Sequence, residues 1–390
     1  MQDNHDIYLD KEDLKISLYS ERIYIDNNWT TVKDMGICTG SGTEPNPYVI
    51  KNLIIDGKGS GPCIHIRNSI VYFKVENCRL SNSGTGYSGI LLVDVNNSQL
   101  INNDCNNNGI GITAARSEFN TFSGNNIYNN IEYGIHLTDS DNNVISENIV
   151  NGNEVGIYLG QSNFNVILSN TGNDNSHGIY LHLSENNTIS GNVVKKNNVF
   201  GILLYSSSNN NNILENVVKG NEDGICLSAS QNNTILENSV SDNHYGIWLH
   251  IFSYNNIILN NSVNGNEVGI VLWAQDPSFA AYNNNIYCNC LSSNDVNGYD
   301  AGLNNQWDNG IKGNYWSNYS GVDENNDGIG DIPYNITGPV NAQDRFPLIT
   351  CPFPTINGSS LIPGYELFFL IGLLSVVIII RIKKIKKMFV

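Results

Sequence analysis

The sequence has few charged residues and very few cations, which limits the partners that it can bind. Only 15% of its 390 residues are charged, and 20 Lys and Arg stand against 37 Asp and Glu, so the formal net charge is −17. Such a surface would repel a phosphate backbone. The one basic cluster is confined to residues 381–387. We therefore expect no nucleic-acid partner.

Metal-binding cysteine motifs and helix-length patterns are missing as well. None of the eight cysteines stands in CxxC spacing, so a zinc site is not expected. The close pair Cys288 and Cys290 would lie on one strand, where both side chains point the same way and cannot bond each other. The repeated part of the chain holds no apolar pattern long enough for a helix, which leaves short strands as its building units.

A Gly-Ile pair recurs at steps of 22 or 23 residues. Each repeat holds three short apolar runs rich in β-branched residues and bounded by Asn and Gly, which is typical of strands and turns. The L-x-x-L-x-L pattern of a leucine-rich repeat is absent, and a step of 22 or 23 residues is not a multiple of the six-residue period of a left-handed β-helix. The period predicts an all-β fold, a right-handed three-faced parallel β-helix solenoid. The glycines are Gly89, Gly111, Gly134, Gly156, Gly178, Gly201, Gly224, Gly246 and Gly269.

Paired asparagines mark one turn of each repeat, with Asn143, Asn187, Asn233 and Asn256 as their second members. Asn tolerates the left-handed turn conformation, and its side chain bonds nearby backbone groups. In coils stacked about 4.8 Å apart, these side chains would also bond one another. We therefore assign them to a structural ladder.

Two columns of each repeat are expected to face outward. The first and third residues after the glycine are apolar and face the core, so the second and fourth point to solvent. Aromatic residues in successive coils suit stacking on sugar rings, which predicts a polysaccharide or glycan partner. The alternative is that Tyr and Trp simply favour strands and that a loop or partner covers them. The candidate ligand-binding residues are Tyr158, Tyr180, His182, Tyr205, Trp248, His250 and Trp273, with a margin of Glu132, Glu154, Glu222 and Glu267.

No catalytic residue is predicted. Polysaccharide lyases and hydrolases need clustered carboxylates, or a calcium site beside a basic residue. The histidines of the outward columns, His136, His182 and His250, lie in separate coils with no evident acid partner. A polysaccharide lyase, hydrolase or epimerase is kept as an alternative function.

A run of oxygen-bearing side chains follows the repeats. Asp323, Asn325, Asp327 and Asp331 have the spacing of a calcium loop, with Gly328 at its sixth position. Position twelve is a tyrosine where an EF-hand has Glu, so the full motif fails. The two interpretations are a dockerin-like or structural calcium site and a solvated Asp/Gly turn.

The coils, the W-D-x-G…G-N-Y-W-S segment at 307–317 and the Asp-Gly-Ile-Gly-Asp stretch at 327–331 resemble the NosD-type parallel β-helix family. This family belongs to a wider group of β-helix carbohydrate-binding and sugar-hydrolase domains. The resemblance covers residues 45–350 and implies a surface or periplasmic protein. NosD itself is associated with copper-site maturation of nitrous-oxide reductase. The chain has three Met and no Cys/His/Met cluster, although copper(I) favours soft ligands, so a copper or envelope accessory role is kept only as an alternative.

The C-terminal end predicts a membrane anchor. Residues 361–380 carry a single acid and are followed by the basic cluster, a pattern that crosses a bilayer with the cations inside. The segment also resembles the C-terminal sorting signals of archaeal and bacterial surface proteins. Residues 1–10 have no apolar signal-peptide region. We therefore expect an outward-facing protein whose leader is missing from this sequence, the alternative being a cytosol-facing tail anchor.

These observations predict five segments. Residues 1–45 form an N-terminal cap, 46–300 the parallel β-helix and 301–350 a Trp/Gly-rich C-terminal cap with the candidate calcium loop. Residues 351–362 form a linker, and 363–387 form the single transmembrane helix and basic tail.

Overall fold

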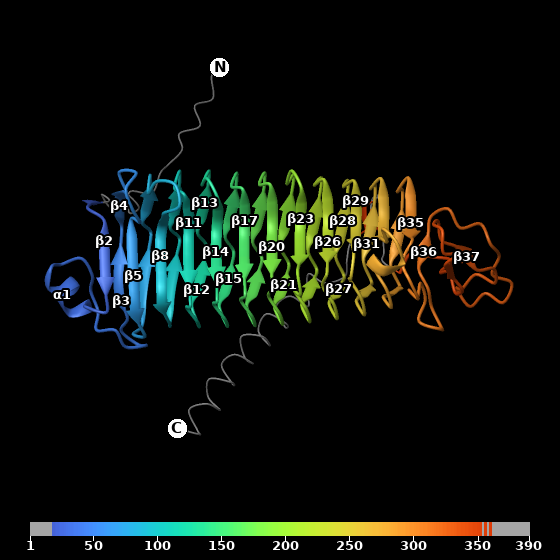
Figure 1. Cartoon of the computed structure of the whole chain (residues 1–390), viewed down its shortest axis with the longest axis horizontal. Coiled ribbons are helices and arrows are strands. Elements are labelled where there is room, and N and C mark those ends of the chain that lie inside the picture. Colours follow the sequence, from blue (N-terminus) through green and yellow to red (C-terminus); the bar gives the residue numbers. More distant parts are fainter. Residues whose placement is uncertain (1–17, 353–354, 357–358, 361–390) are drawn as a thin grey trace, which may run out of the picture. The chain divides into compact units, whose positions relative to one another are not determined.

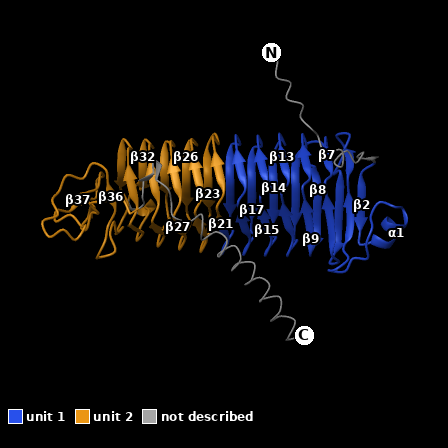
Figure 2. Cartoon of the chain, turned by 180° about the vertical axis from the view of Figure 1, so that it is seen from behind, with its two compact units in different colours: residues 1–188 blue, residues 189–390 orange. Residues whose placement is uncertain are grey.

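A computed structural model describes residues 18–352, 355–356 and 359–360. The chain divides into two compact units, residues 1–188 and 189–390 (Figure 2). Within each unit, successive coils add one strand to each of three parallel sheets, here named sheets A, B and C (Figure 1). This arrangement confirms the predicted all-β parallel solenoid with three faces.

In unit 1, hydrogen-bonded neighbours in each sheet come from consecutive coils. Sheet A contains β1 (Leu18–Ser20), β4 (Leu53–Asp56), β7 (Arg79–Ser81), β10 (Asp104–Asn106), β13 (Asn126–Tyr128), β16 (Ile149–Asn151) and β19 (Thr171–Asn173). Sheet B contains β2 (Ile23–Asp26), β5 (Ile64–Ser69), β8 (Ser88–Val95), β11 (Ile110–Ala115), β14 (Tyr133–Thr138), β17 (Val155–Gly160) and β20 (His177–His182). Sheet C contains β3 (Tyr48–Lys51), β6 (Phe73–Glu76), β9 (Ser98–Ile101), β12 (Thr121–Ser123), β15 (Val144–Ser146) and β18 (Val166–Leu168), and β21 (Thr188–Ser190) begins where the unit ends.

Unit 2 repeats this order. Sheet A contains β22 (Val193–Lys195), β25 (Val217–Lys219), β28 (Ser239–Ser241), β31 (Ser262–Asn264), β34 (Cys290–Ser292) and β36 (Tyr315–Trp316). Sheet B contains β23 (Phe200–Tyr205), β26 (Asp223–Ser228), β29 (Tyr245–Leu249), β32 (Val268–Leu272) and β35 (Val296–Asp300), and sheet C contains β24 (Asn212–Leu214), β27 (Thr234–Leu236), β30 (Ile257–Leu259) and β33 (Asn285–Tyr287). The short 3-10 helix η1 (Pro277–Phe279) follows β32, and two antiparallel pairs close the described part: β37 (Tyr334–Asn335) with β38 (Gln343–Asp344), and β39 (Thr355–Ile356) with β40 (Ser359–Ser360).

The core is built from the same three positions of every coil. Ile135 from sheet B, Ile145 from sheet C and Val150 from sheet A are all fully buried in one coil. Burying such side chains stabilises a fold by roughly 1.5–3 kcal/mol each, so the repeated inward columns are a principal source of stability.

The asparagine ladder is confirmed. In unit 1, Asn143 Oδ1 accepts hydrogen bonds from the backbone N–H and the Nδ2 of Asn120, at 2.9 and 3.1 Å. Its own Nδ2 donates to Asn165 Oδ1 in the next coil, at 3.2 Å. In unit 2, Asn233 bonds Asn256 in the same way. The side chains thereby satisfy backbone groups in turns that the coils bury.

The segment expected to cap the N-terminal end contains β1, β2 and the one-turn helix α1 (Trp29–Asp34). Trp29 of α1 is buried, donates from Nε1 to Ser69 Oγ at 2.8 Å, and stacks on Tyr48 with ring centroids 5.0 Å apart. The helix therefore holds its aromatic ring against the first strands of sheet C.

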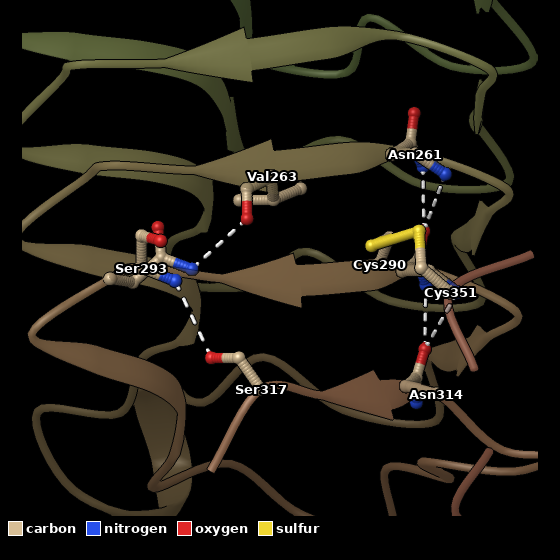
Figure 3. Close-up of a disulfide and its surroundings, with 9 residues drawn as sticks. Asn261, Val263, Cys290, Ser293, Asn314, Ser317 and Cys351 are labelled. Carbon is tan, nitrogen blue, oxygen red and sulfur yellow. Dashed lines mark hydrogen bonds between the residues drawn. A yellow bond between two sulfur atoms is a disulfide. The ribbon is translucent and has the colours of Figure 1, made fainter. Parts of the chain in front are cut away.

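At the other end, the Trp-rich segment is fixed by buried carboxyl groups. Trp307 donates from Nε1 to Asp300 Oδ2 and Trp316 to Asp344 Oδ2, both at 2.8 Å. A disulfide joins Cys290 of β34 to Cys351, where the expected linker begins (Figure 3). The sequence had indicated no partner for Cys290.

Among the residues that the structure describes, no helix is both long and apolar enough to cross a membrane. The predicted anchor and tail at 363–387 lie outside those residues.

Candidate functional site

In unit 1, the outward aromatic residues of sheet B lie in register on consecutive strands. His136 of β14 pairs with Tyr158 of β17, which pairs with Tyr180 of β20. All three side chains are partly buried. The ring centroids of His136 and Tyr158 are 5.2 Å apart, as are those of Tyr158 and Tyr180, in edge-to-face geometry. The column is therefore a continuous aromatic stripe whose rings support one another.

His182, at the end of β20, belongs to the same surface. Its Nδ1 lies 3.3 Å from the hydroxyl of Tyr158. This contact links the two outward columns that the sequence predicts, and it places a polar group beside the tyrosine ring. An aromatic face with hydrogen-bonding groups at its edge is the arrangement that sugar rings require.

In unit 2, Trp248 of β29 is the centre of a second aromatic group. Its ring lies 4.6 Å from that of His250 and 5.2 Å from that of Tyr245. Trp273 lies 6.5 Å from Tyr299, and Tyr205 at the end of β23 is 43% exposed. The predicted residues of unit 2 thus lie on sheet B or directly after its strands: Tyr205 ends β23, Trp248 is in β29, and His250 and Trp273 follow β29 and β32.

Two tyrosines that directly precede a glycine also lie on the outward face, which the sequence analysis missed. Tyr133 packs on His136 with ring centroids 4.5 Å apart, and Tyr245 packs on Trp248. A Cβ on Gly134 would point toward the core side chain Val150 and lie 2.6 Å from the Gly156 carbonyl oxygen. The glycine and the isoleucine after it therefore both face inward. Strict alternation breaks at the glycine, and the preceding residue is turned to the surface.

Asp223 of unit 2, which directly precedes Gly224, enters the site in this way, and His244 of the glutamate margin lies beside it. Asp223 begins β26 and pairs in register with Tyr245. His244 Nδ1 lies 3.5 Å from Asp223 Oδ1, and His244 Nε2 lies 3.6 Å from Glu267 Oε2. The imidazole of His244 therefore stands between two carboxyl groups beside the aromatic cluster, whereas the sequence analysis considered only His136, His182 and His250 and found no acid partner for them.

Burial shifts the pKa values of several titratable side chains on this surface. It raises the pKa of Asp223, against the opposing effects of the Tyr245 backbone N–H and His244. It lowers the pKa of His250, and it lowers that of His136 to about 4. Both imidazoles are therefore neutral near pH 7 and can donate or accept hydrogen bonds.

The candidate calcium residues form a self-bonded turn. Asp323 accepts hydrogen bonds from the backbone N–H groups of Asp327 and Gly328, at 3.1 and 3.0 Å. Asp331 accepts from the N–H of Glu324 at 2.7 Å, and Asn325 donates to Asp327 at 3.0 Å. Across the described ranges, no group of three or more His, Cys, Asp or Glu has the geometry to hold a metal ion.

The sequence is similar to a known protein family. The family model described as "Periplasmic copper-binding protein (NosD)" matches residues 5–154, 65–189 and 137–321. A search of curated protein sequences returned no match.

Two solved structures are similar in fold. The A-module of the mannuronan C-5 epimerase AlgE6 from Azotobacter vinelandii is 14% identical, with a TM-score of 0.53 over 66% of this chain and 86% of that chain. The Dettilon tailspike protein is 15% identical, with a TM-score of 0.56 over 66% of this chain and 58% of that chain. At this identity the likeness concerns the fold alone.

Proposed function

The chain belongs to the NosD family, and we propose that it is a membrane-anchored cell-surface protein that binds a polysaccharide or glycan through the outward face of sheet B. The observation that carries this proposal is the register of the aromatic residues. His136, Tyr158 and Tyr180 stand on three successive strands of unit 1, and Tyr245 and Trp248 form a cluster in unit 2.

Rings held in this way suit an extended sugar chain. Each ring is partly buried and is braced by neighbouring rings, so little side-chain entropy is lost when a ligand stacks on it. Neighbouring strands are about 4.8 Å apart, which is close to the length of one pyranose ring. A glycan that crosses the strands would therefore meet a new aromatic side chain every one or two sugar residues. The hydroxyl of Tyr158 and the imidazole of His182 supply hydrogen-bonding groups at the edge.

A glycan array probed with the full chain tests the proposal. We expect a single class of polysaccharide to be retained, and we expect the signal to fall for Trp248→Ala and Tyr180→Ala. Phe252→Ala and Phe164→Ala are matched controls, because these exposed aromatic residues lie on turns outside the strands of sheet B. An array on which nothing is retained, or equal signals for all four variants, would reject glycan binding.

The location is part of the same proposal. The apolar run at 361–380 and the basic residues after it support an anchor whose preceding domain faces outward. Membrane fractionation with and without residues 353–390, followed by protease treatment of intact cells, tests this location. Release of the shortened protein and cleavage of the anchored one are expected.

The copper-binding description of the family does not fit the described residues of this chain. They contain no metal-holding group of His, Cys, Asp or Glu, as stated above. Cys63 and Cys78 are buried in the core, at 0% and 2% exposure, and belong to no such group. We therefore derive no copper chemistry for this chain.

A second candidate function is acid–base catalysis on a polysaccharide, and the contact between Asp223 and His244 favours it. A buried carboxyl group with a raised pKa beside an imidazole is a combination that enzymes use for proton transfer. Assays for new reducing ends and for unsaturated products test it on the glycan that the array selects. Turnover that is lost in His244→Gln would establish this activity, and no product from the wild-type protein would reject it.

A further inference from the structure

The edge of sheet B in unit 2 carries acidic residues on successive coils. One position recurs in four coils, two residues before the glycine, or before Asn297 in the last coil. It is occupied by Glu222, His244, Glu267 and Asp295. Backbone hydrogen bonds join consecutive coils there, from His244 N to Glu222 O at 2.7 Å and from Val296 N to Glu267 O at 3.0 Å. Three of the four side chains are carboxylates, with His244 inserted between them.

Asp223 adds a buried carboxyl group to this edge. Its side chain is 9% exposed, and its Oδ1 is buried without a hydrogen-bond partner. The imidazole Nδ1 of His244 lies 3.5 Å from this oxygen, which is longer than a charge-assisted hydrogen bond. Because leaving a buried carboxyl oxygen unpaired is costly, a charged donor placed on Asp223 would be strongly stabilised.

The aromatic rings beside Asp223 favour the same kind of ligand. The ring of Tyr245 lies 4.0 Å from that of His244 and 5.2 Å from that of Trp248. The faces of Tyr and Trp carry negative charge density and attract cations. A carboxyl group and two aromatic rings together offer the groups that bind an ammonium ion, and the rings can also stack on the sugar that carries it.

The cations that an acidic sugar would need do not occur on these strands. β23, β26, β29, β32 and β35 contain no Lys or Arg. Lys219 lies on sheet A and is paired with Asp242 at 2.7 Å. A uronic-acid polymer would meet only carboxylates and neutral groups at this edge, and its charge would be repelled.

We propose that the face formed by Asp223, Tyr245, Trp248 and Glu267 selects amino sugars, with Asp223 and Glu267 receiving the ammonium group of a glucosamine-type unit. This inference rests on the proposed glycan-binding function and specifies the chemical class of its ligand. A carboxylate that accepts a hydrogen bond from an ammonium group in a partly buried site improves affinity by about ten-fold or more over a neutral isostere.

Calorimetric titration of the full chain with hexamers of glucosamine, N-acetylglucosamine and mannuronic acid tests the proposal. We expect the glucosamine hexamer to bind about ten-fold more tightly than its acetylated form, and the mannuronate hexamer to bind most weakly. Asp223→Asn should reduce the preference for the amine to below about two-fold while leaving the affinity for the acetylated hexamer unchanged. Glu267→Gln, which changes an exposed side chain, should reduce the preference in part if Asp223→Asn fails to fold. Asp242→Asn, which changes a carboxylate in the turn after β28 that pairs with Lys219, should leave the preference intact.

Each other outcome overturns the inference. Equal binding of the amine and acetylated hexamers, or a preference that survives in both Asp223→Asn and Glu267→Gln, would leave glycan binding in place and remove the amino-sugar assignment. Spermidine binding as tightly as the glucosamine hexamer would mean that only the charge is recognised. Binding of none of the hexamers, together with an empty glycan array, would reject the proposed function itself.

Discussion

The indole Nε1 of Trp316 donates a 2.8 Å hydrogen bond to Oδ2 of Asp344, a carboxyl group with no exposed surface. Burial raises the pKa of Asp344 from its ordinary 3.8 to about 6, although the Asn314 N–H, Trp316 and the Phe346 N–H oppose the shift. The Trp-rich segment is thus held by a carboxyl group whose ionised form is destabilised by burial.

The pH dependence of stability should reveal this acid. Because the folded-state pKa is raised, the contribution of Asp344 is fully present below about pH 4 and is lost as the pH rises through about 6. The free energy of unfolding from urea titrations should fall by about 3 kcal/mol over this window. The decrease should be absent in Asp344→Asn, and an unchanged profile in that variant would contradict the assignment.

The stability that depends on His136 should change with pH in the opposite direction, falling as the pH is lowered. Burial lowers its pKa from 6.5 to about 4, so the stability that comes from its neutral form is present above about pH 6.5 and is lost as the pH falls toward 4. Proton NMR should show its imidazole signals constant down to about pH 5 in the folded protein and titrating near 6.5 in urea. A folded-state midpoint near 6.5 would mean that the ring is not buried on sheet B.

Removing one ladder asparagine should be costly. Asn148 accepts from the N–H of Asn125 and donates to the carbonyl oxygen of Phe122, both at 2.9 Å. Asn148→Ala leaves both backbone groups buried without partners, and should lower the free energy of unfolding by about 2–5 kcal/mol. Asn126→Ala, at an exposed position on the same unit, should change it by less than about 0.5 kcal/mol. Similar losses in the two variants would contradict a ladder-specific role.

The disulfide should stabilise the C-terminal end. Cys290 and Cys351 are 61 residues apart, and closing a loop of that length restricts the unfolded chain by about 4 kcal/mol in the chain-entropy view. Cys351→Ser should therefore raise hydrogen exchange in residues 301–350. Cys288→Ser, which removes an unpaired thiol, should not. Exchange that is equal in both variants would indicate that the bond adds nothing to the cap.

Much of the fold could be predicted from the sequence because each coil of a solenoid has the same types of residue at the same positions. The Gly-Ile period places Ile135 and Ile157 in register in the core, and Asn143 in a ladder, as the structure confirms. Each position recurs in many coils, so its pattern is clear from one chain. The disulfide could not be predicted, since Cys351 lies beyond the repeats and nothing in its surroundings sets a register with Cys290.

The site was predicted only in part, and the glycine is the reason. Alternation counted from the glycine of each repeat correctly places Tyr158, Tyr180 and Trp248 on the outward face. The count did not consider the position directly before the glycine, where Tyr133, Tyr245 and Asp223 lie. The close approach of Gly134 to the Gly156 carbonyl oxygen turns the chain there, which no pattern of apolar residues records. For that reason Asp223 was missed, although Glu267, the other acid beside His244, was named in the acidic margin.

The most direct test of the account is a titration of the array-selected oligosaccharide into wild-type protein, Trp248→Ala and Phe252→Ala. The aromatic face of sheet B predicts that Trp248→Ala weakens binding by about ten-fold or more, whereas Phe252→Ala binds as the wild type does. Affinity that is equal in all three proteins would contradict the claim that this face holds the glycan.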